Sequence, residues 1–225
     1  MAQRRIIKDN FKKATLKFPK LKLIWQEDVF LCCGEVDVFD HENVYWDSFN
    51  IEIKIPIKSY PYQFPTLFLT DGRLPIDDER HVNADMSCCV EVEQKQLLRA
   101  KKGITILQFL DEYVVPYFAS QLYYEKKTDW AGGEYKHGFD GSLQYYQELT
   151  GILETSILSD FLKNIWRYKN MGMYDDCFCG SGRKLKFCHK VALKEILMIS
   201  PKKIESDIAA LERMLERNNE IKSEL

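Results

Sequence analysis

The sequence has neither a long apolar run nor a phosphate-binding loop. Its apolar stretches fall short of the ~18 to 20 residues that a membrane-spanning helix needs. The opening segment, MAQRRIIKDN, lacks the apolar core of a signal peptide. Internal repeats, low-complexity stretches and a glycine-rich loop after a strand-like segment are also missing. We therefore expect a cytoplasmic protein, and we expect no nucleotide, nucleic acid or membrane among its partners.

A disulfide framework does not suit this chain, because its seven cysteines are an odd number and three of them have metal-binding spacing. Thiols in that arrangement are typical of a reducing compartment. The 225 residues are enough to bury a full core, and 45% of them are hydrophobic. The composition therefore predicts a globular protein that uses cysteines as thiolates.

The first hundred residues have the pattern of a β-sheet. Segments rich in β-branched and aromatic residues, with alternation clearest in FNIEIKIPI, are interrupted by Asp, His, Asn and Gly as turns would be. The predicted strands cover residues 21–28, 30–39 and 48–57, with a short fourth strand around 67–69 between prolines. We predict an antiparallel meander.

Beyond residue 100 the pattern becomes helical. Thr105 can cap a helix that Pro116 should kink or end. A loop then covers residues 129–141. The further predicted helices cover residues 143–149 and 155–167, and an exposed helix runs from 202 to the end.

The run CFCGSGRKLKFCHK predicts a zinc site. Cys177, Cys179, Cys188 and His189 fall within thirteen residues, and Gly180 to Gly182 supply a turn that lets both ends meet at one ion. Thiolates and imidazole suit tetrahedral zinc, and four protein ligands leave no position for substrate. The site would therefore be structural; the alternative is four unconnected residues. Basic side chains beside the loop would favour deprotonated thiols. These are Arg183, Lys184, Lys186 and Lys190.

The same run resembles the small zinc motif (SEC-C) at the C-terminus of the SecA preprotein translocase. The resemblance covers about residues 177–190. It implies a stabilising or partner-docking appendage.

A second chemical signal is the segment RHVNADMSCCV, residues 80–90. A strand-like meander precedes it, then the element YPYQFP, and a helix opening ITILQFLDEY follows it. In this order and in these motifs, residues 1 to about 125 resemble a bacterial ubiquitin-conjugating enzyme. His81 and Asn83 match the family's His-Pro-Asn tripeptide, with Val82 in place of proline. The loop is about two residues shorter than in the family, and Met86 stands where glycine is usual.

The resemblance implies that a cysteine carries a protein tail as a thioester. Sulfur is both a strong nucleophile and a good leaving group. Cys89 is the favoured nucleophile, because Cys88 fills the family's aliphatic slot. Asn83 would stabilise the oxyanion or order the loop. His81 would act as a base or, as in the family, hold the loop.

Several charges have two interpretations. The N-terminal segment is basic, and by resemblance Arg4, Arg5 and Lys8 would contact an activating enzyme; the alternative is a solvated helix face. Asp85 and Glu91 would steer or deprotonate an incoming lysine, or are ordinary loop charges.

Together these features predict an α+β protein with a four-stranded antiparallel sheet and the fold of a ubiquitin-conjugating enzyme. We expect a catalytic domain over residues 1–125, a helical extension over 126–172, the zinc motif over 173–192 and a final helix over 193–225. The predicted function is transfer of a ubiquitin-like protein, or of another activated tail such as that of a cGAS-like nucleotidyltransferase, from Cys89 to a target lysine. By analogy with bacterial relatives, the setting would be antiviral defence.

Two other classes stay open. The first is a catalytically inactive module that binds ubiquitin-like tails. The second, a redox or zinc-storage protein using Cys88 and Cys89, is weaker, because adjacent cysteines rarely form unstrained disulfides.

Overall fold

The computed structural model describes residues 2–130 and 134–223, which form two compact units. Unit 1 ends at His137 and unit 2 begins at Gly138. The predicted α+β class and four-stranded antiparallel sheet are confirmed. The predicted four-part division stays a prediction. No described helix is both long enough and apolar enough to span a bilayer.

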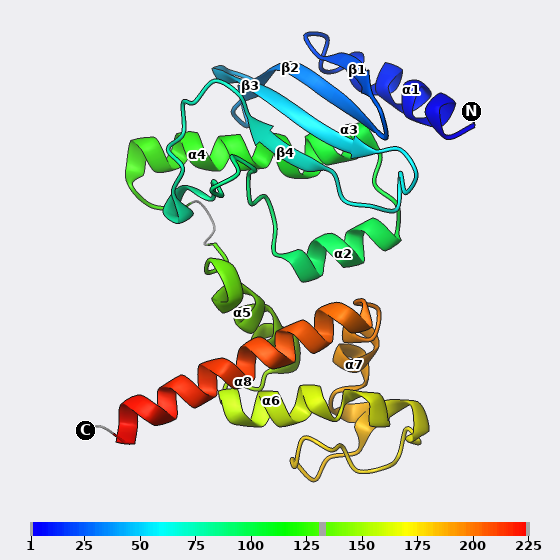
Figure 1. Ribbon diagram of the computed structural model, residues 1–225, viewed down its shortest axis with the longest axis vertical. Helices are drawn as coiled ribbons and strands as arrows, with labels where there is room; N and C mark the ends of the chain where they lie inside the picture. Colours follow the sequence, from blue (N-terminus) through cyan, green and yellow to red (C-terminus); the bar gives the residue numbers. More distant parts are fainter. Residues whose placement is uncertain (1, 131–133, 224–225) are drawn as a thin grey trace. The chain divides into compact units, whose positions relative to one another are not determined.

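Unit 1 is built on a meander with strand order β1-β2-β3-β4 (Figure 1). The strands are β1 (Lys22–Gln26), β2 (Val29–Phe39), β3 (Tyr45–Pro56) and β4 (Thr66–Leu69). Alternation along β3 explains its orientation: Phe49, Ile51, Ile53 and Ile55 are buried, whereas the residues between them lie on the other face. All four strands predicted from the sequence are present, and their ends differ from the prediction by at most a few residues.

Helices cover one face of this sheet. Ile7 and Ala14 of α1 (Ala2–Thr15) are fully buried. The main layer is α3 (Ile106–Phe109), a π-helical turn (Leu110–Val114) and α4 (Val115–Lys127). Phe118 of α4 stacks on Phe49 of β3, with ring centroids 4.1 Å apart. Helix α2 (Glu93–Lys101), which the sequence did not predict, follows the cysteine pair.

Pro116 does not end the helical run. The α-helical pattern changes to a π-helical turn that ends at Val114, two residues before the proline, and α4 then continues to Lys127. Proline has no N–H to donate to the preceding turn, and a π-bulge is a common way to absorb such an irregularity within a helix. The predicted cap is confirmed, because Thr105 and Gln108 form a capping box.

Unit 2 is helical. Its elements are α5 (Gly138–Thr150), α6 (Thr155–Lys163), α7 (Lys190–Ile196) and α8 (Pro201–Ser223), with a 3-10 segment at Ile165–Asn170 (Figure 1). The final helix predicted over 193–225 is divided in the structure, because α7 begins at Lys190 and ends at Ile196, and α8 begins only at Pro201. Helix α8 packs on α5 and α6 and buries Ile204 and Leu211. The prediction of an exposed final helix was therefore wrong for the face of α8 that carries these two residues.

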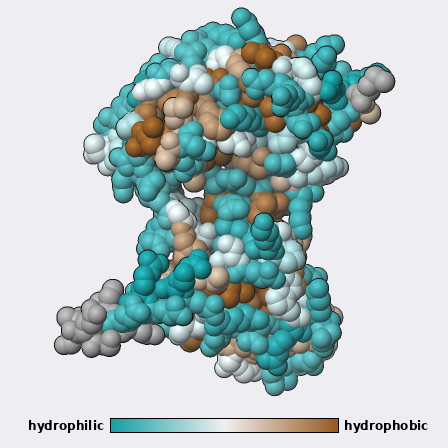
Figure 2. Space-filling model, viewed as in Figure 1, coloured by the Kyte–Doolittle hydropathy of each residue, from teal (hydrophilic) through white to brown (hydrophobic). Residues whose placement is uncertain are grey.

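The loop predicted over residues 129–141 is shorter than expected, because α5 already begins at Gly138. Residues 131–133 of that prediction lie outside the described residues. On the face drawn in Figure 2, hydrophilic residues dominate and hydrophobic residues form small patches. The apolar residues that carry the strand and helix patterns are mainly inside the two units.

Candidate active-site loop and metal centre

The segment from His81 to Cys89 is tied to the sheet at its Cys88 end and is closed by a hydrogen bond between its own ends. The backbone N–H of Cys88 donates to the carbonyl of Leu67 in β4, and that of Cys89 donates to the carbonyl of His81, both at 2.8 Å. A short 3-10 turn (Asp78–Arg80) leads into the loop, and His81 itself adopts a left-handed conformation with φ of 51°. The cysteine pair is therefore held in a defined position beside His81.

The two adjacent cysteines have different surroundings. Cys88 is 7% exposed and packs in the core, whereas Cys89 is exposed at the surface. Burial raises the pKa of Cys88 to about 11. The pKa of Cys89 is also raised, first by partial desolvation among its neighbours and then by the Glu91 carboxylate. Exposure favours Cys89 as the reactive thiol, although which cysteine reacts stays a prediction.

The Asn83 side chain orders the loop. Its Nδ2 donates to Ser87 Oγ at 2.9 Å, and Ser87 Oγ donates in turn to the Asp85 carboxylate at 2.6 Å. The hydroxyl and the backbone N–H of Ser87 both donate to the Asp85 carboxylate, and these two hydrogen bonds lower the pKa of Asp85. Met86 has φ of 66°, in the region that favours the glycine usual at this position in the resembled family. Asp85 is therefore engaged within the loop, while the Asn83 amide still has a second N–H.

Two buried residues of α4, which the sequence did not single out, hold this loop. Tyr117 donates its hydroxyl to the carbonyls of Arg80 and His81, at 3.2 and 3.3 Å. Gln121 donates to the Arg80 carbonyl and accepts from the Arg80 guanidinium, both at 2.8 Å. The sequence signal that could have revealed them is a glutamine four residues after a tyrosine, on a helix face whose other buried residues are apolar. The His81 ring contacts Glu134 and His137, from the segment after α4.

Alkylation of Cys89 should speed up steeply with pH. Because its pKa is raised above the ordinary value, the reactive thiolate is a minor species at neutral pH. In a Cys88→Ala background, the iodoacetamide rate at Cys89 should rise about tenfold per pH unit between pH 7 and 9. Peptide mass spectrometry separates this cysteine from the others. A rate that levels off below pH 8 would contradict the raised pKa.

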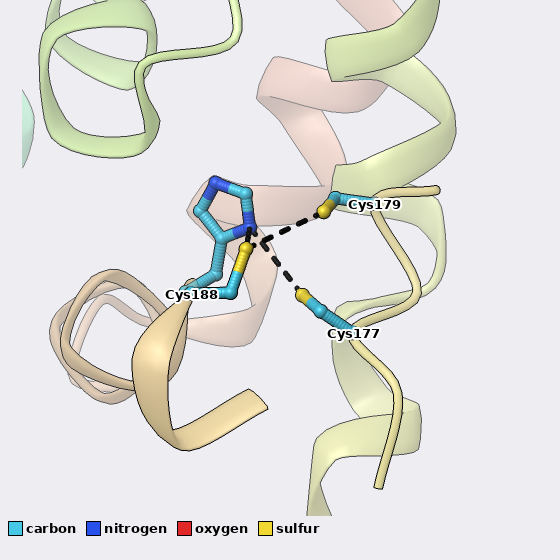
Figure 3. A group of neighbouring side chains, drawn as sticks. Cys177, Cys179 and Cys188 are labelled. Atoms are coloured by element: carbon cyan, nitrogen blue, oxygen red, sulfur yellow. Dashed lines mark hydrogen bonds between the residues drawn. The ribbon is translucent and has the colours of Figure 1, made fainter. Parts of the chain in front are cut away.

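In unit 2 the four predicted metal ligands do come together. Figure 3 shows the sulfurs of Cys177, Cys179 and Cys188 converging on one point. His189 Nδ1 lies 3.4 Å from Cys177 Sγ and 3.3 Å from Cys188 Sγ, and Cys179 Sγ lies 3.6 Å from Cys188 Sγ. Ligands around tetrahedral zinc are separated by roughly 3.4 to 3.8 Å when the bond lengths are those of Zn–N and Zn–S. The cluster therefore has the donor set and the spacing to hold a metal.

The surroundings of His189 suit a ligand. Its Nε2 lies 2.7 Å from the carbonyl of Thr150, the last residue of α5, and so Nδ1 is the nitrogen that faces the sulfurs. A carbonyl that accepts from the outer ring nitrogen orients a metal-bound histidine and sets its tautomer. His189 is 7% exposed. This partner lies 39 residues away along the chain, and local spacing did not reveal it.

The thiols of the cluster differ in their pKa. Burial raises the pKa of Cys177 to about 11. Burial also opposes ionisation of Cys179, but hydrogen bonds from Ser181 and the neighbouring thiols outweigh it and lower the pKa of Cys179 to about 6. Of the basic residues near the loop, Lys184 pairs with Asp176 at 2.8 Å and Lys186 donates to the Tyr174 hydroxyl at 3.2 Å. Local hydrogen bonds therefore favour one thiolate at this cluster.

Comparison with known proteins identifies no family: no protein-family model, no curated protein and no solved structure matches the chain.

Proposed function

We propose that unit 1 is a ubiquitin-conjugating-type transferase that carries a protein tail as a thioester on Cys89. The observation that carries this proposal is the exposed Cys89 thiol, held by backbone hydrogen bonds in a loop that directly follows a four-stranded meander. The order of α1, meander, cysteine loop and later helices supports the finer assignment to the conjugating-enzyme fold.

The proposed reaction has two acyl transfers. In the first, the Cys89 thiolate attacks the thioester between the modifier and its activating enzyme, and the activating enzyme leaves as its own thiolate. In the second, a lysine amine attacks the Cys89 thioester; the C–S bond breaks, an isopeptide bond forms and the thiol is restored. Each transfer passes through a tetrahedral oxyanion. The second N–H of the Asn83 amide would serve that oxyanion, since the first is used by Ser87.

Asn83→Ala should slow discharge of the Cys89 thioester to free lysine by ~10², because loss of one oxyanion donor has about this effect elsewhere. Ser87→Ala is the matched variant: it removes the Asn83 hydrogen-bond partner and leaves both amide N–H groups in place. Ser87→Ala should discharge within a few-fold of wild type in a single-turnover assay. Equal slowing by both variants would reassign Asn83 to loop ordering alone.

For the activating enzyme we propose the basic face of α1. Arg4 stacks its guanidinium over the Trp25 ring at 3.6 Å, and Arg5 lies 3.8 Å from Asp9. Arg5 is largely exposed, and so it could contact a partner, as could Lys8. A role in antiviral defence belongs to the same proposal and rests on the resemblance alone. The cytoplasmic setting stays a prediction from the composition and the cysteine pattern.

We propose that the Cys177 cluster holds a structural zinc ion. Support comes from the soft donor set, the ligand spacing and the Thr150 carbonyl behind His189. Zinc would fasten the 177–189 loop and fix the geometry of unit 2 around it.

The alternative function is an inactive module that binds ubiquitin-like tails. The observation that favours it is the raised pKa of Cys89, because desolvation and the Glu91 carboxylate disfavour the thiolate that loading requires. A loading assay separates the two functions. It uses the purified chain, ATP, and an activating enzyme and modifier encoded by neighbouring genes. A reductant-sensitive adduct supports the transferase, whereas modifier binding without an adduct supports the binding module.

A further inference from the structure

A second cluster of metal-ligating side chains lies in unit 1. His81, beside the cysteine pair, meets Glu134 and His137 from the segment that follows α4, and one ligand atom from each lies within 4.8 Å of the others. His81 Nε2 is 2.5 Å from Glu134 Oε2, and the centroids of the two imidazole rings are 4.4 Å apart. Residues separated by more than fifty positions therefore converge on one point.

A hydrogen-bonded His–Glu pair explains only part of this arrangement. It accounts for the contact between His81 and Glu134 but gives no reason for a second imidazole at the same place. Two imidazoles and one carboxylate, however, form the donor set of hydrolytic zinc sites and of non-haem iron sites. Imidazole nitrogens select zinc and its transition-metal neighbours over magnesium or calcium, which prefer oxygen ligands.

His81 is preorganised as a ligand. Its backbone N–H donates to the Asp78 carbonyl, and its own carbonyl accepts from Cys89 and from the Tyr117 hydroxyl. Its side chain is 13% exposed and that of Glu134 is 30% exposed, so solvent reaches both ligands only in part. A ligand held by its backbone loses little conformational entropy when it binds a metal.

The aromatic surroundings also suit a partly dry site. The Trp130 ring lies 5.2 Å from His81 and 4.6 Å from Tyr124. Within the described part of the chain, His81 Nδ1 and Trp130 Nε1 are buried nitrogens without a hydrogen-bond partner. Buried polar groups are normally satisfied. Because Nε2 is the His81 nitrogen that faces Glu134, an ion held with Glu134 would bind Nε2, and the buried Nδ1 would take a partner of its own, such as a water molecule.

We propose that His81, Glu134 and His137 bind a divalent transition-metal ion, zinc in the first instance, with at least one coordination position left open. The ion would fasten the segment after α4 to the loop that holds Cys89. The ion would also occupy the lone pair of a His81 ring nitrogen, which a general base needs to accept a proton. His81 would therefore act as a ligand and not as a base. This inference stands independently of the conjugation reaction, because it concerns only metal binding by the chain.

The test uses cobalt as a spectroscopic probe of the full-length chain. The protein is first loaded with one equivalent of zinc to occupy the Cys177 cluster and is then titrated with Co²⁺. Wild type should take up about one further equivalent, with visible d–d absorption and without the near-ultraviolet thiolate-to-cobalt band. His137→Ala should lose this uptake. His41→Ala removes an exposed histidine elsewhere and should behave as wild type.

A second variant separates metal binding from simple pairing. Glu134→Gln keeps a side-chain oxygen that can accept a hydrogen bond from His81, but it removes the anionic ligand. It should weaken cobalt binding by about tenfold or more, as expected when an anionic ligand is lost. Circular dichroism and the zinc content of unit 2 report folding on the same samples. Wild type that takes up no further cobalt, or a His137→Ala variant that takes up as much as wild type, would overturn the proposal.

Discussion

Replacing Cys89 by serine is expected to abolish formation of a reductant-sensitive adduct with the modifier. Serine keeps the size of the side chain, but its oxygen forms an ester that thiols do not cleave. With activating enzyme, modifier and ATP, wild type should give a band on non-reducing gels that dithiothreitol removes. Cys89→Ser should give either no band or one that resists the reductant.

Cys88 supplies the matched control for that experiment. It is the adjacent residue and is also a thiol, but it is 7% exposed and its pKa is raised to about 11 by burial. Cys88→Ala should therefore load, with some loss of stability from the small cavity it leaves. Loading by Cys89→Ala at the wild-type rate would mean that the other cysteine is the nucleophile. Absence of loading by wild type with a matched activating enzyme would favour the binding module.

Cys177→Ser should release the zinc held by the cysteine cluster and unfold much of unit 2. Structural zinc contributes on the order of 10 kcal/mol of binding free energy to small domains, and most of that is folding free energy. Elemental analysis of desalted protein should find about one zinc per chain in wild type and none at this cluster in the variant. Limited proteolysis should then cut within residues 138–223 while residues 2–130 stay protected.

Cys33→Ser is the control for the metal experiment. Cys33 is half-buried in β2 and lies far from the cluster in sequence, and its thiol lies 3.9 Å from the Glu52 carboxylate. This variant should keep all its zinc and the wild-type proteolysis pattern. A zinc-free wild-type protein, or full metal retention by Cys177→Ser, would contradict the structural-zinc proposal.

Some features of this protein are determined by its sequence alone, because the relevant interactions are local. The four ligands of the cysteine cluster fall within thirteen residues, so a tight turn suffices to bring them together. The alternation around Phe49 to Ile55 defines a strand with one buried face, since successive side chains point to opposite sides. The Thr105 cap is equally local, because it joins residues three positions apart.

Other features were decided only by the tertiary structure. The pattern SCCV contains two chemically identical thiols, and only the folded structure, in which Cys88 joins the core and its backbone bonds to Leu67, leaves Cys88 buried and Cys89 exposed. The tertiary structure alone also brings the Tyr117 hydroxyl to the carbonyl of His81. It likewise brings the Glu134 carboxylate to the His81 ring. These contacts join residues distant in the chain, and their free energy depends on how whole elements pack and exclude water. Local propensity and spacing carry no record of that packing.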